Sequence, residues 1–215
     1  MRKGFHRQLD TLHLELVKMG AQCEQAISAA IKALIEGDAG MAEIAAARER
    51  DIDAQEREIE NLCMKLLLQQ QPVAKDLRAI SSALKMISDM ERIGDQAADI
   101  AEISRHIASA PLPDDLPITE MARCAIKMVT DSVGSFVKED LQLARDVIEY
   151  DDMVDSLFLR TKEALTTLIG DKSTSAPLAL DLLMAAKYLE RIGDHAVNVA
   201  EWVTYSITGS KPTGG

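Results

Sequence analysis

The residues best placed to do chemistry are carboxylates spaced four positions apart inside a repeated pentapeptide. The sequence ERIGD occupies residues 91–95 and returns unchanged at residues 190–194. On an α-helix, residues four apart lie on one face about 6 Å from each other, near enough for two carboxylates to share a cation. The repeat therefore predicts an internal duplication with one helical acid pair in each half. The pairs are Glu91 with Asp95 and Glu190 with Asp194.

Other residues extend these acid pairs. At 100° per residue, Asp99 and Glu102 fall on the same stripe as the first pair, whereas the second half has Asn198 in place of the third acid. We therefore expect the second site to carry less charge. The preceding helix of each half supplies a further pair at the same spacing, Glu49 with Asp53 and Asp151 with Asp155.

The positions of the turns predict that the acid pairs of each half face one another. In an antiparallel helical hairpin, residues at equal distances from the turn lie side by side. The midpoint between Asp53 and Glu91 is position 72, which is a proline. The midpoint between Asp155 and Glu190 lies within the polar segment 170–175. Both hairpins should thus bring two acid pairs level with each other.

Clustered carboxylates repel one another unless a cation or a basic partner neutralises them. Oxygen ligands suit Mg²⁺, Mn²⁺ or Ca²⁺, and carboxylate-bridged iron or zinc stays open. The sequence therefore predicts one all-carboxylate metal site in each half. The predicted ligands are Glu49, Asp53, Glu91, Asp95 and Asp99 in the first half and Asp151, Asp155, Glu190, Asp194 and Asn198 in the second.

Three other interpretations stay open. The acids are also compatible with a solvated helix face that nearby Arg and Lys side chains screen. A scaffold that binds basic partner segments without metal is the second. The third is a di-metal enzyme, but such bundle enzymes place Glu-x-x-His pairs inward, and these acidic stripes have none. Gly94 and Gly193 separate the acids of each pentapeptide, where a missing side chain admits a ligand or a close neighbour, or is simply tolerated.

Helical periodicity runs through almost the whole sequence and predicts an all-α fold of two tandem three-helix bundles, six helices in total. The first bundle spans 1–109, with helices over 5–36, from a cap at Asp38 to the glutamine tract at 69–71, and from Pro72 to about 108. The second spans 118–207, with helices over 118–137, 140–169 and 176–205. Residues 110–117 hold three prolines and read as a linker, and 208–215 as a disordered tail.

The composition and the absence of common motifs exclude several classes of function. The chain has 24 basic and 35 acidic residues, a net charge of −11, which disfavours nucleic acid and anionic lipid. Three scattered cysteines indicate reduced thiols in a cytosolic setting. No stretch of 18 apolar residues and no signal peptide is evident, so we expect a soluble, unprocessed protein. The common nucleotide-binding and hydrolase motifs are absent, and no enzymatic activity is expected.

With these repeated motifs, the sequence resembles the PhoU family of phosphate-signalling regulators. The resemblance covers about residues 5–207 and rests on the two ERIGD motifs and on KDLR at 75–78. It implies tandem three-helix bundles, multinuclear metal binding at the acidic motifs and no enzymatic activity. It further implies a cytoplasmic negative regulator, a dimer or higher oligomer, that meets the membrane only through its partners. Those partners would be the ATPase subunit of the phosphate ABC transporter and a sensor histidine kinase.

Overall fold

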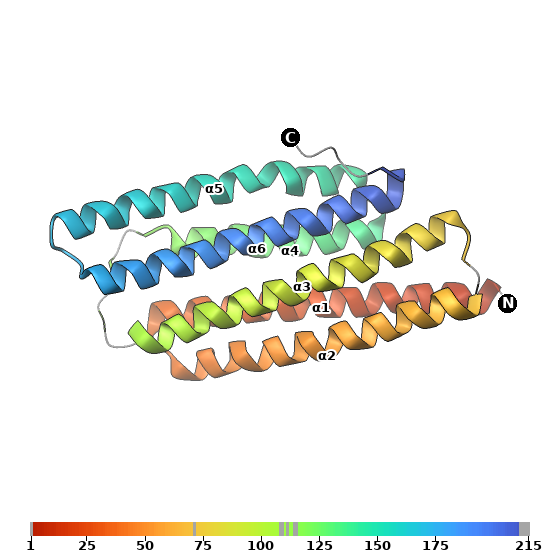
Figure 1. The fold of residues 1–215 in the computed structure, drawn as a ribbon, viewed down its shortest axis with the longest axis horizontal. Coiled ribbons are helices and arrows are strands. Elements are labelled where there is room, and N and C mark those ends of the chain that lie inside the picture. The colour runs from red at the N-terminus through yellow and green to blue at the C-terminus, as the bar shows by residue number, and fades with distance from the viewer. Residues whose placement is uncertain (1, 71, 108–109, 111, 114–115, 211–215) are drawn as a thin grey trace.

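The described residues form a bundle of six long helices, in which successive helices run in opposite directions. The computed structural model describes residues 2–70, 72–107, 110, 112–113 and 116–210, and in these residues all regular structure is helical. The helices, shown in Figure 1, are α1 (Arg2–Glu36), α2 (Ala39–Gln70), α3 (Ala74–Ile107), α4 (Ile118–Lys138), α5 (Leu141–Gly170) and α6 (Ala176–Thr208). The predicted all-α fold is confirmed, and the helix ends lie within three residues of the predicted ones.

Side-chain caps fix several of these ends. The carboxylate of Asp38 accepts hydrogen bonds from the backbone N–H groups of Gly40 and Met41, at 2.9 and 3.2 Å. At the matching position of the second half, Asp140 accepts from Leu143 N at 3.0 Å. Such caps satisfy N–H groups that have no partner within the helix. Helix α6 runs on to Thr208, the first residue of the predicted tail, while residues 211–215 lie outside the described part of the chain.

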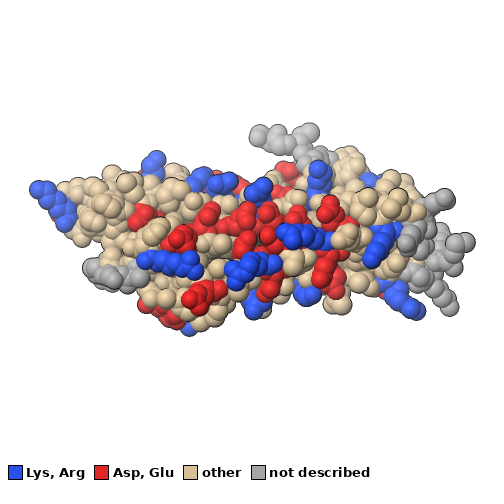
Figure 2. Space-filling model, turned by 60° about the horizontal axis from the view of Figure 1, so that its bottom comes forward, with Lys and Arg blue, Asp and Glu red and all other residues tan. Residues whose placement is uncertain are grey.

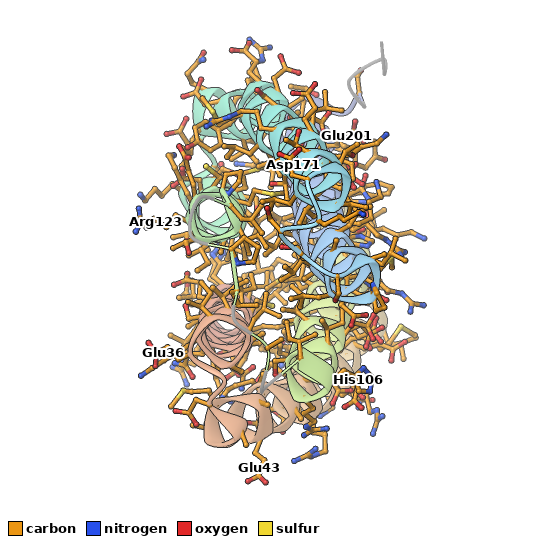
Figure 3. The ribbon with its side chains drawn as sticks, turned by 90° about the vertical axis from the view of Figure 1, so that its left-hand side faces the viewer. Glu36, Glu43, His106, Arg123, Asp171 and Glu201 are labelled. Carbon is orange, nitrogen blue, oxygen red and sulfur yellow. The ribbon has the colours of Figure 1, made fainter. Side chains whose placement is uncertain are left out.

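The two halves lie side by side and share one continuous core. Seen end on in Figure 3, α1 and α4 form one side and α3 and α6 the other, with α2 and α5 at opposite ends. Repeated positions occupy equivalent places, since Met19 and Met121 are both fully buried, as are Ile52 and Val154. No described helix is both long and apolar enough to cross a membrane.

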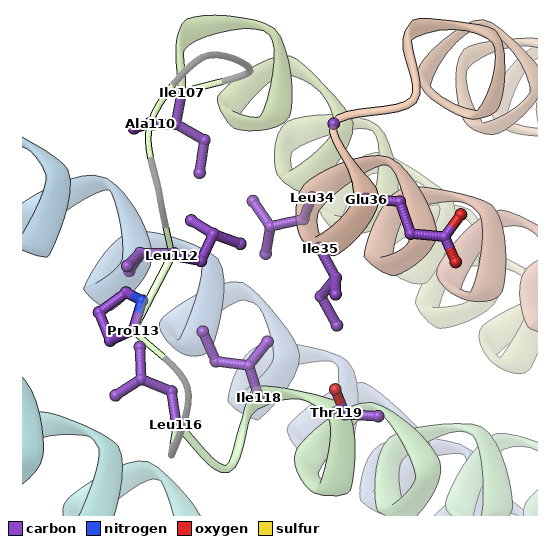
Figure 4. Close-up of a pocket in the computed structure, with 12 residues that line it drawn as sticks. Leu34, Ile35, Glu36, Ile107, Ala110, Leu112, Pro113, Leu116, Ile118 and Thr119 are labelled. Carbon is purple, nitrogen blue, oxygen red and sulfur yellow. The ribbon is translucent and has the colours of Figure 1, made fainter.

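The two ends of the molecule join the halves differently. At one end, Arg78 Nε of α3 donates to the Ser206 carbonyl of α6 at 3.3 Å, and Lys75 pairs at 2.7 Å with Glu139, the residue that follows α4. At the other end the halves leave a cavity of about 450 Å³ beside the linker. Figure 4 shows side chains from α1, α4 and the linker around this cavity. They include Leu34, Leu112 and Ile118.

Helices α2 and α3 approach each other closely at Gly94. A Cβ atom at this position would lie 2.9 Å from Ile52 Cδ1, and Ile52 is fully buried. In the second half, a Cβ at Gly193 would lie 3.1 Å from Asp151 Oδ1. Of the two roles that the sequence suggested for these glycines, the structure supports a close neighbour. The glycines let the acid-bearing helices come together.

We predict that Gly94→Ala destabilises the protein by about 1–3 kcal/mol, because the fully buried Ile52 would have to shift away from the new methyl group at a cost that exceeds the gain in helix propensity. The matched control is Gly134→Ala in α4, where a Cβ would meet nothing within 4 Å. There the alanine should stabilise the helix by up to about 1 kcal/mol. Urea unfolding measures both, and equal stability of the two variants would contradict the close approach.

Candidate metal centre

The register of the first hairpin brings the acids of α2 and α3 within electrostatic reach. Burial raises the pKa of the Glu49 carboxyl, and the charges of Asp53 and of Asp95 across the hairpin raise it further. The pKa of Glu91 is also raised, first by burial and then by Asp95, with smaller contributions from Glu56 and Asp53 of α2. The acids face each other across the turn at Pro72, as the register predicted.

In the second hairpin, the largest effect falls on Asp151. The pKa of Asp151 is raised from 3.8 to about 6, mainly by burial and then by Asp155, Asp194 and Glu190. Its Oδ1 atom is buried and has no hydrogen-bond partner. A buried carboxylate oxygen without a hydrogen-bond donor costs free energy. Binding a proton or a cation at Asp151 would remove this cost.

The acids lie near the surface and not in the core. The side chains of Glu91 and Asp95 are 23% and 32% exposed, and that of Glu190 is 14% exposed. In Figure 2, Asp and Glu gather across the middle of one face, with Lys and Arg set among them. A solvent ion can therefore reach both clusters.

Basic side chains partly neutralise these acids. Arg92 lies 3.5 Å from Glu91 and 3.1 Å from Asp95, and Lys187 pairs with Glu190. Asp53 has Arg57 at 3.9 Å. No basic side chain is a leading influence on the pKa of Asp151.

Asp99 and Asn198, which follow the acid pairs of α3 and α6, lie where these two helices meet. The pKa of Asp99 is raised by burial and by Asp95, and the charge of Arg191 from α6 opposes this rise. Asn198 donates from Nδ2 to Asp89 Oδ1 at 3.0 Å. The asparagine thus already has a partner across the seam.

Asp89 and His195 form a contact that the sequence did not reveal. The Nδ1 atom of His195 lies 3.0 Å from the same Asp89 oxygen that Asn198 contacts. Glu56, another acid not singled out from the sequence, accepts a hydrogen bond from Ser88 at 3.3 Å and adds to the negative charge around Glu91. Glu56 follows Asp53 by three residues on α2, and this helical spacing could have predicted that it lies beside the first acid cluster.

The side chains as they stand do not form a complete ligand set. Among the described residues, no three His, Cys, Asp or Glu side chains are arranged to hold one metal ion. The donor chemistry nevertheless fits a hard cation, because both clusters offer carboxylate oxygens and Asp151 Oδ1 is unpaired. The ten predicted ligands remain a prediction.

We predict that Asp151→Asn stabilises the metal-free protein near neutral pH by about 1 kcal/mol, after allowance for partial solvent exposure. The folded pKa of about 6 exceeds the ordinary 3.8, so the folded protein binds more protons between these values and loses stability as pH rises through them. The gain should therefore vanish near pH 4. Urea unfolding in chelator at both pH values measures it.

The control for this measurement is Asp152→Asn, which removes the same charge from the neighbouring exposed side chain. It should give a smaller gain near neutral pH. If the two variants respond alike at both pH values, the special environment of Asp151 is refuted.

Comparison with known proteins gives the family. The model of the PhoU domain matches residues 16–104 and again 118–203. A curated relative from Clostridium acetobutylicum is 37% identical over 98% of this chain and 97% of its own length. Another, from Pseudomonas aeruginosa, is 32% identical over 96% of this chain and 86% of its own. Both are named phosphate-specific transport system accessory protein PhoU homologs.

Solved structures agree with this. The crystal structure of PhoU from Pseudomonas aeruginosa matches with a TM-score of 0.89 at 32% identity, covering 96% of this chain and all of that one. The phosphate transport system regulatory protein PhoU from Streptococcus pneumoniae matches with the same TM-score at 26% identity, covering 97% of this chain and 99% of that one. The duplicated domain, the six-helix fold and these relatives together place the chain in the PhoU family.

Proposed function

We propose that this protein is a cytoplasmic, metal-binding negative regulator of phosphate homeostasis, without enzymatic activity of its own. The regulatory role is supported by relatives that are named accessory or regulatory proteins of phosphate transport. The observation that carries the metal-binding role is Asp151, a carboxylate with four other acids around it and one buried oxygen that lacks a partner.

The acids that would hold metal come from two helices in each half. In the first half they are Glu49 and Asp53 from α2 with Glu91, Asp95 and Asp99 from α3, and in the second Asp151 and Asp155 from α5 with Glu190, Asp194 and Asn198 from α6. A bound Mg²⁺, Mn²⁺, iron or zinc ion would supply positive charge that relieves their repulsion. Arg92 and Lys187 would then be released from the carboxylates that they now contact.

The proposed partners follow from the family. The protein would contact the ATPase subunit of the phosphate ABC transporter and a sensor histidine kinase, holding the kinase in its signalling-off state when phosphate is plentiful. We also propose a homodimer or higher oligomer. With a net charge of −11, the chain favours basic protein surfaces over nucleic acid, and it would meet the membrane only through these partners.

A second candidate function is a metal-independent scaffold whose acids bind basic partner segments. The observation that favours it is the pairing of the acids with Arg92 and Lys187, since these side chains show how a partner's basic residues would be received. Partner binding that survives exhaustive chelation would favour this function over the first.

We predict that protein purified without chelator carries metal in both halves, measured by elemental analysis. The double variant Glu91→Ala and Glu190→Ala should lose most of it, because each change removes one carboxylate from a cluster. Circular dichroism must show unchanged helicity. The control variant Glu43→Ala and Glu163→Ala, at exposed acids outside the clusters, should keep its metal. A wild type that stays empty on titration with manganese, zinc and ferrous iron would refute the metal role.

For the regulatory role, we predict that deleting the gene in its host raises phosphate uptake in phosphate-rich medium. Reintroducing the wild-type gene should lower the uptake again. Radiolabelled phosphate uptake measures this directly. The double variant at Glu91 and Glu190 should restrain uptake less than wild type at equal protein level. Unchanged uptake in the deletion strain would contradict the proposed regulator.

A further inference from the structure

The outer face of the α5–α6 hairpin carries exposed apolar side chains beside the second acid cluster. Leu180 and Met184, one helical turn apart on α6, are 58% and 45% exposed, and Leu159 of α5 is 56% exposed. The row on α6 continues at helical spacing through Lys187 to Glu190. On α5, Leu159 follows the cluster acid Asp155 by four residues. We call Leu159, Leu180 and Met184 the apolar row.

At the aligned positions the first half is different, although the two halves share one repeated domain, and its own exposed apolar side chains, such as Leu68 and Leu77, lie closer to the turn. The residues aligned with Leu159, Leu180 and Met184 are polar or charged. They are Arg57, Ser81 and Lys85. The two halves therefore differ at these three positions, which are polar in the first half and apolar in the second.

An aligned contact between the helices has changed in the same way. In the first half, Ser88 donates to Glu56 at 3.3 Å. At the matching positions of the second half, Lys187 Nζ lies 5.4 Å from the centre of the Phe158 ring and also pairs with Glu190. Lys187 therefore joins the apolar side of the face to the acid cluster. In Figure 2, the left-hand end, where the tip of this hairpin lies, is mostly tan between the acids and a basic side chain at the extreme tip.

We infer that this face docks an amphipathic helix of a partner protein, with apolar residues one turn apart against the apolar row and a basic side chain against the second acid cluster. Paired helices offer a groove that matches the spacing of apolar residues on a third helix. The unpaired oxygen of Asp151 and the surrounding acids attract positive charge at one end of the face. A second copy of this chain, with its own net charge of −11, suits these acids less well.

This inference deepens the proposed function by assigning a partner contact to the second half. It rests on that function only for the existence of a partner, because the apolar row does not need metal. The basic residue and a metal ion would compete for the same acids, so the experiment uses chelated protein.

The test measures binding of a synthetic helical peptide of about five turns, with leucines along one face and lysines along the other, by fluorescence anisotropy. Wild type should bind this peptide more tightly than a scrambled peptide of the same composition. Leu180→Ser with Met184→Gln should weaken binding about tenfold or more without altering charge. The control, Leu14→Ser with Val17→Gln, makes the same change at exposed apolar residues of α1 and should leave binding unchanged.

Several results would overturn the inference. They are equal binding of the scrambled peptide, no binding by wild type, or equal losses in the two double variants. A change in the oligomeric state of the Leu180 and Met184 double variant, measured by sedimentation, would also overturn it. Such a change would mean that the face joins copies of this chain. Metal content of the same variant separates the two proposals, because it should stay at the wild-type level whether or not the peptide binds.

Discussion

The carboxylates that face each other across the two hairpins repel one another, and the packing of the helices holds them there. Ile52 against Gly94 fixes how closely α2 and α3 approach, and Gly193 does the same beside Asp151. The core on the other side of these helices is aliphatic and fully buried, so it supplies the stability that this repulsion opposes. A cation or a basic side chain that enters either cluster is therefore favoured by the fold itself.

Duplication produced two similar hairpins that have since diverged. In the first, Arg92 contacts both acids of its pentapeptide, whereas in the second Lys187 contacts Glu190 and Asp151 keeps an unpaired oxygen. The surface next to the second cluster is apolar at Leu180 and Met184, where the first half has Ser81 and Lys85. The two halves thus share a fold and an acid pattern, but they offer different surfaces to a partner.

The sequence predicted the six helices and the hairpin registers because both depend on short-range features: helical periodicity, capping aspartates and turns at Pro72 and 170–175. The sequence did not predict the contacts between α3 and α6. Asp89 meets His195 and Asn198 across a seam that no short turn connects, so no local rule sets its register. Nor does the spacing of acids determine their rotamers, which decide whether three oxygens converge on one ion.

The most direct test of the account is the position of bound metal. Crystals grown without chelator and soaked in Mn²⁺ should give anomalous difference peaks beside both acid clusters, one between α2 and α3 and the other between α5 and α6. Peaks at both places, within coordination distance of the carboxylates, are the result that the account predicts. Crystals that show no anomalous peak at either cluster, or peaks only elsewhere, would contradict it and leave the acids as a surface for basic partners.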